Sequence, residues 1–135
     1  MNFLRKLSPI WILRIALGAM YLYSGYDLFV NPSGWIWALP LWFKNIIEPF
    51  AALESYLKIQ GAAEFLTALL LLAWFTPKRL ICLIALFSSL ELLFILFFSP
   101  QFSITFRDIG VLGSSLALFV LTLKDSEQIE PLPNN

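Results

Sequence analysis

The sequence predicts an all-α membrane protein, in which four transmembrane helices form a single bundle. Hydrophobic residues make up 59% of the 135 residues and charged residues 13%, against about 45–50% and about 25% in ordinary soluble domains. A water-soluble domain of this size leaves much of its surface exposed and cannot hide so much apolar area. Four stretches are also long and apolar enough to cross a hydrocarbon core of about 30 Å as helices.

The four stretches divide one domain, residues 1–135, into spans of approximately residues 10–30, 57–75, 80–98 and 104–123. Helix-stopping residues that include proline follow the first three spans, at residues 31–34, 76–77 and 99–100. Helices are expected because every backbone polar group needs a partner in the absence of water. The first stretch contains Arg14 and is too long for an ordinary signal sequence. We therefore expect this segment to stay in the protein and not to be cleaved off as a signal peptide.

The connection between residues 31 and 56 is too apolar to be a freely solvated loop. Pro40 and Pro49 divide it into short pieces that carry Trp35, Trp37 and Trp42. We interpret these pieces as interfacial half-helices on the outer mouth of the bundle. They have two possible roles, a membrane-surface anchor or a lid over a site. The acidic, proline-containing tail, residues 125–135, is expected to be disordered.

Basic residues predict the orientation, because cytoplasmic connections carry an excess of lysine and arginine. One side of the predicted bundle holds Arg5, Lys6, Lys78, Arg79 and Lys124. The opposite side holds Lys44, Lys58 and Arg107. Both termini are therefore expected in the cytoplasm, and the bacterial cytoplasmic (inner) membrane is the expected location.

Missing residue types exclude several kinds of chemistry. The chain has no histidine, which excludes imidazole-ligated haem, histidine metal sites and Ser-His or Cys-His catalysis within it. Cys82 is the single cysteine, so no internal disulfide or CxxC pair can form. The net charge of zero gives no basic patch for nucleic acid. We predict no metal site and no covalently bound cofactor.

Ionisable residues inside the spans are the candidate functional residues, because a charge in mid-membrane costs roughly 2.5–3.5 kcal/mol. Five of them belong to the outer half of the predicted bundle and are expected to form one polar cluster: Asp27, Glu64, Glu91, Arg107 and Asp108. The cluster has a functional interpretation and a structural one, in which Arg107 pairs with Glu64 or Glu91 to hold the helices in register. Arg14 is expected to extend to the inner interface.

Small residues predict where the helices approach each other, because they let membrane helices pack closely. Arg14, Gly18 and Gly25 share one face of the first helix, and Gly61, Glu64 and Ala68 share one face of the second. The expected packing positions are Gly18, Gly25, Gly61, Gly110 and Gly113.

Three motifs across most of the chain make it resemble the DoxX-like family of small four-helix membrane proteins. They are Arg14-Ile-Ala-Leu-Gly18 followed by Gly25, Gly61-Ala-Ala-Glu64, and Phe106-Arg107-Asp108-Ile-Gly110-Val-Leu-Gly113. Some relatives are subunits of a membrane thiosulfate:quinone oxidoreductase, and others accompany membrane complexes that handle thiol or oxidative stress. The resemblance implies a quinone-associated role with Glu64, Arg107 and Asp108 as functional positions. Asp27 departs from the basic residue that the family often has there, which weakens the transfer of an anionic-substrate site.

Three hypotheses about function follow. The first is a quinone-linked subunit or accessory component of a membrane oxidoreductase, in which acids near an arginine relay protons and a redox partner or the quinone supplies the electron chemistry. The second is a non-enzymatic scaffold or assembly factor for a partner complex. The third is a small transporter or channel, which the lack of a polar stripe along the helices makes least favoured. Each would work within the lipid bilayer, and association of several copies is left open.

Overall fold

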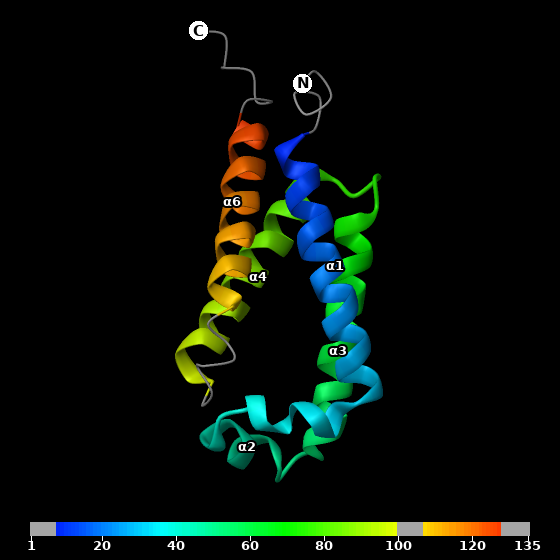
Figure 1. Cartoon of the computed structure of the whole chain (residues 1–135), viewed down its shortest axis with the longest axis vertical. Coiled ribbons are helices and arrows are strands. Elements are labelled where there is room, and N and C mark those ends of the chain that lie inside the picture. The colour runs from blue at the N-terminus through cyan, green and yellow to red at the C-terminus, as the bar shows by residue number, and fades with distance from the viewer. Residues whose placement is uncertain (1–7, 100–106, 128–135) are drawn as a thin grey trace, which may run out of the picture.

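The computed structural model describes residues 8–99 and 107–127, and these residues form helices without any strand (Figure 1). The all-α class predicted from the sequence is confirmed. The helices are α1 (Pro9–Val30), the 3₁₀ helix η2 (Pro32–Ala38), α2 (Leu41–Ile47), α3 (Leu53–Leu72), α4 (Lys78–Phe98) and α6 (Asp108–Glu127).

The four long helices are arranged as two pairs. α1 packs along α3, and α4 packs along α6. The pairs converge at the end where α1 begins and α6 ends, and they separate toward the other end, where η2 and α2 lie across the opening (Figure 1).

α1 and α4 begin and end within two residues of the predicted stretches, whereas α3 begins four residues and ends three residues before the predicted bounds. Proline sets two of the boundaries, since Pro9 opens α1 and Pro77 precedes α4. The fourth predicted stretch begins at residue 104, and residues 104–106 lie outside the described residues. α6 continues to Glu127, three residues into the predicted disordered tail, and residues 128–135 are again outside the described residues, as are Arg5 and Lys6.

Among the described helices, only α4 is long and apolar enough to cross a membrane when length and composition are the sole criteria. All four long helices carry ionisable side chains. In α4 these are Lys78, Arg79 and Glu91. In the others they are Arg14 and Asp27 on α1; Glu54, Lys58 and Glu64 on α3; and Asp108, Lys124 and Asp125 on α6.

The core lies at the convergent end, where all four long helices contribute apolar side chains. Its buried members are Leu17, Tyr21, Ala68, Leu71, Ile81, Ile84, Ala85 and Leu118. One hydrogen bond of 2.9 Å between the hydroxyls of Ser89 and Ser115 joins α4 to α6 beside this core. The polar atoms of these two buried serines are thereby satisfied within the bundle.

α1 and α3 approach most closely where two glycines meet. A Cβ atom built on Gly61 would lie 2.8 Å from the Gly25 carbonyl oxygen, and one built on Gly25 would lie 2.7 Å from the Gly61 carbonyl oxygen. Only glycine fits such a backbone contact. Gly18 instead faces the side chain of Leu72, and a Cβ on Gly110 or Gly113 would meet nothing within 4 Å.

Arg14 joins α1 to the end of α3. Its Nε donates to the Leu71 carbonyl at 2.7 Å, and its Nη2 donates to the Ala73 carbonyl. Its guanidinium carbon also lies 4.1 Å from the ring centroid of Trp11. The side chain is 6% exposed, so it caps the negative end of the α3 dipole rather than extending past the end of its own helix.

Candidate functional site

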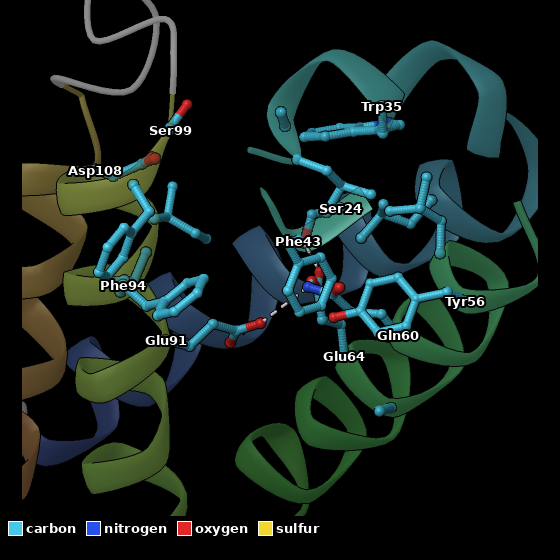
Figure 2. Close-up of a pocket in the computed structure, with 18 of the residues that line it drawn as sticks. Ser24, Trp35, Phe43, Tyr56, Gln60, Glu64, Glu91, Phe94, Ser99 and Asp108 are labelled. Carbon is cyan, nitrogen blue, oxygen red and sulfur yellow. Dashed lines mark hydrogen bonds between the residues drawn. The ribbon is translucent and has the colours of Figure 1, made fainter. Parts of the chain in front are cut away.

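A cavity of about 670 Å³ lies between the two helix pairs, on the side where they separate (Figure 2). Residues from all four long helices, η2, α2 and the segments beside them line it. Its volume is within the range of about 300–1,000 Å³ that is usual for small-molecule sites. Most of the lining is apolar, and its polar side chains lie mainly around Gln60 and at the start of α6.

Gln60 is the centre of the polar lining. Its side-chain amide donates to Glu64 Oε1 at 3.3 Å and to Glu91 Oε1 at 3.2 Å. Glu64 lies on α3, one turn after Gln60, whereas Glu91 reaches toward them from α4 across the cavity (Figure 2). One amide group therefore joins two carboxyl groups that come from different helices.

Two hydroxyl groups on α1 complete this polar group. The Ser24 hydroxyl donates to Glu64 Oε2 at 2.5 Å, and the Tyr21 hydroxyl donates to Glu91 Oε2 at 3.0 Å. All four carboxyl oxygens thus accept a hydrogen bond from a side chain of the protein. We call Tyr21, Ser24, Gln60, Glu64 and Glu91 the carboxyl cluster.

Aromatic side chains close the end of the cavity beneath η2 and α2. Trp42 on α2 contacts Phe94 and Phe98 of α4 edge-on, with ring centroids 5.9 and 5.6 Å apart. Phe43, the next residue, contacts Tyr56 of α3 at 5.3 Å. α2 therefore spans from α3 to α4, and ring contacts of this geometry hold it at both sides.

The cavity also reaches the side of the bundle between α3 and α4. Ile59 lines the cavity although 72% of its surface is exposed, and Phe94 lines it at 41%. Contacts between α3 and α4 are sparse, so few side chains close this gap. Ile59 and Phe94 thus form an apolar part of the cavity border that is accessible from outside the bundle.

Asp27 lies apart from the other candidate acids. Its carboxyl group accepts a hydrogen bond from the Trp35 indole at 2.8 Å and one from the Asn31 amide at 3.3 Å. Asp27 does not line the cavity, although Trp35 does. It therefore fixes the start of η2 against the end of α1 and orients one cavity wall.

Arg107 and Asp108 line the same cavity as the carboxyl cluster, at the start of α6. Arg107 is exposed, and among the described residues it forms no ion pair with Glu64 or Glu91. The five predicted residues thus occupy three places: Glu64 and Glu91 in the carboxyl cluster, Arg107 and Asp108 elsewhere on the cavity wall, and Asp27 outside it.

Tyr21, Ser24 and Gln60 belong to the site, but the sequence analysis did not select them. Gln60 precedes Glu64 by four residues, a spacing that places both side chains on one helix face. Tyr21 follows Gly18 by three residues and precedes Gly25 by four, so it shares the small-residue face of α1. The sequence therefore indicates Gln60 by its spacing from Glu64, and Tyr21 by its spacing from Gly18 and Gly25.

The carboxyl cluster can hold a polar head group and exchange protons with it, because carboxyl groups both accept and release protons. No group of three or more potential metal ligands occurs among residues 8–99 and 107–127.

Comparison of the chain with protein-family models, with curated proteins and with solved structures finds no match.

Proposed function

We propose that the chain is an integral membrane protein with four spans, in the bacterial inner membrane with both termini in the cytoplasm, whose cavity binds a lipid-soluble molecule. The outer faces of the helices support four spans. Large apolar side chains are exposed on α1, α3, α4 and α6, among them Phe29, Leu66, Phe87, Phe97, Ile109 and Leu116. Exposed apolar surface of this extent is unfavourable in water and favourable in lipid.

The positions of Arg14, Glu64 and Glu91 are consistent with a bundle in lipid. Arg14 satisfies backbone carbonyls of α3, and the acids of the carboxyl cluster point into the cavity rather than toward the outside. Ionisable side chains in membrane helices are expected to face the interior or a cavity in this way. η2 and α2 then lie at the outer interface, where tryptophan is enriched.

The observation that carries the ligand proposal is the combination of an aromatic, laterally open cavity with a carboxyl cluster on its wall. A ring-bearing molecule dissolved in the membrane can enter between α3 and α4, stack near Phe43 and Phe94, and place its polar head at Glu64 and Glu91. Isoprenoid quinones have this chemistry, and the resemblance to the DoxX-like family favours the same class. The protein would act as a quinone-linked subunit or accessory component, with a partner protein supplying the redox chemistry.

Mass spectrometry of organic extracts tests this proposal. The wild-type protein, Glu64→Gln and Glu91→Gln are purified gently from native membranes, and the quinone per chain is measured. Asp125→Asn is the matched control, because this acid pairs with Lys78 at 3.1 Å on an exposed surface far from the cavity. We expect about one quinone per wild-type or control chain and a clear loss in both glutamate variants.

The absence of quinone from folded wild-type protein would contradict the proposal. The exposed apolar helix faces would then favour the scaffold or assembly-factor hypothesis, and crosslinking in intact membranes would identify the partner.

The number of spans is tested separately by reporter fusions after Asn31, Thr76 and Ser99. Alternating cytoplasmic and external locations are expected.

A further inference from the structure

The carboxyl cluster uses all of its own hydrogen-bond donors. The Tyr21 and Ser24 hydroxyls donate to one glutamate each, and both hydrogens of the Gln60 amide nitrogen are directed at carboxyl oxygens. A hydroxyl has one donor hydrogen and a primary amide has two. No donor of these three side chains therefore remains for a bound molecule.

Acceptor capacity, in contrast, is in excess on the same wall. Each carboxylate oxygen can accept about two hydrogen bonds, and each of the four receives one from the protein. The Gln60 carbonyl oxygen adds a further acceptor. Tyr56, one turn before Gln60 on the same face of α3, adds a hydroxyl that can either donate or accept.

A ligand head with only carbonyl groups fits this wall poorly. While Glu64 and Glu91 are ionised, its oxygens would face carboxylate oxygens with no hydrogen between them, and only the Tyr56 hydroxyl on this wall could donate to such a head. A desolvated acceptor without a donor is costly. A head with hydroxyl groups supplies the missing hydrogens and makes charge-assisted hydrogen bonds to the carboxylates. The rest of the lining is mainly apolar and aromatic, with Arg107 and Asp108 at the start of α6, and it accommodates the same ring in either form.

We infer that the cavity selects a head group that donates hydrogen bonds, and that within the quinone class it prefers the reduced, dihydroxy form over the oxidised, dicarbonyl form. The inference rests on the proposed function and specifies which redox state the site holds. Tyr21, Ser24 and Gln60 are positioning residues in this account, since they orient the carboxyl groups that contact the ligand. Glu64 and Glu91 are the contacts that discriminate between the two forms.

Binding of three matched short-chain ligands to the full-length protein in lipid nanodiscs tests the inference. The ligands are a benzoquinone, its quinol kept reduced under anaerobic conditions, and the dimethyl ether of that quinol, which retains the ring but cannot donate. We expect the quinol to bind about tenfold or more tightly than either of the others, as two added hydrogen bonds predict. In the Glu64→Gln, Glu91→Gln double variant, amide donors replace carboxylate acceptors, so tight quinol binding should be lost and the quinol should bind no better than the other two ligands. Asp125→Asn should keep the preference for quinol.

The outcomes separate this inference from the proposed function. Equal binding of quinone and quinol, or tighter binding of the quinone, overturns the inference and leaves the quinone site in place. Failure of all three ligands to bind folded wild-type protein overturns the proposed function as well. If the double variant does not fold, the wild-type comparison between quinol and its dimethyl ether still decides, because these ligands differ in their donor hydrogens.

Discussion

Tyr21 on α1 and Glu91 on α4 are joined by a hydrogen bond of 3.0 Å between the phenol hydroxyl and Oε2. Gln60 on α3 bonds the other oxygen of the same carboxyl group. Glu91 is thus the point at which the α4–α6 pair is linked to the α1–α3 pair through polar groups. Glu91 therefore bridges the two helix pairs within the carboxyl cluster (Figure 2).

Tyr21→Phe should weaken this link without changing the shape of the core. Tyr21 is 3% exposed, and the substitution removes only the hydroxyl group. We expect the free energy of unfolding to fall by about 1 kcal/mol, the usual contribution of one such hydrogen bond. Titration with SDS in mild detergent micelles measures this change. Tyr23→Phe, at a position 73% exposed on the same helix, is the control and should have no effect.

Gly61→Ala should separate α1 from α3. The added Cβ would lie 2.8 Å from both the Gly25 carbonyl oxygen and the Phe29 amide nitrogen, and backbone atoms cannot move aside as a side chain can. Overpacking of this kind costs typically about 1–3 kcal/mol. SDS titration should show a loss of stability in that range.

Gly113→Ala is the matched control for the glycine prediction. A Cβ there meets nothing within 4 Å, and alanine has the higher helix propensity. We expect unchanged or slightly increased stability. Equal destabilisation by the two substitutions would contradict the assignment of Gly25 and Gly61 as the contact between α1 and α3.

The sequence predicted the elements of the fold better than their pairing. Long apolar stretches separated by proline determine where helices begin and end, and Pro40 falls between η2 and α2 as expected. Which helices pair depends on surface fit, which periodicity alone does not specify. The contact between Gly25 and Gly61 follows from small-residue spacing, whereas Gly110 and Gly113 share that spacing and face open space.

The candidate site was predictable by residue type but not by hydrogen-bond partner. Ionisable residues inside apolar helices identified Glu64 and Glu91 because of the cost of desolvation. Their partners are neutral side chains, Gln60, Tyr21 and Ser24, which charge-based selection does not detect. Asp27 met the same charge criterion, but the indole of Trp35 eight residues later holds it away from the cavity.

Arg14→Met should destabilise the end of α3. Methionine retains much of the side-chain volume but leaves the carbonyl oxygens of Leu71 and Ala73 without the guanidinium donor. Hydrogen bonds to charged groups contribute about 1.5–3 kcal/mol each, so we expect a loss of at least about 1.5 kcal/mol in SDS titration. Arg79→Met, at an exposed position on α4, is the control. An equally small effect of both substitutions would exclude a capping role for Arg14.

Trp42→Ala should release α2 from α4 while leaving the four long helices packed. Trp42 supplies the ring contacts with Phe94 and Phe98, each worth about 0.5–1.5 kcal/mol beyond burial, and α2 has no buried residue of its own. Hydrogen exchange followed by mass spectrometry should show faster exchange in residues 41–47 and little change in α1 and α3. Trp74→Ala, at an 83% exposed position beyond the end of α3, should leave exchange in α2 unchanged. If α2 kept its protection in Trp42→Ala, the Phe43–Tyr56 contact with α3 would be the one that holds this helix over the cavity.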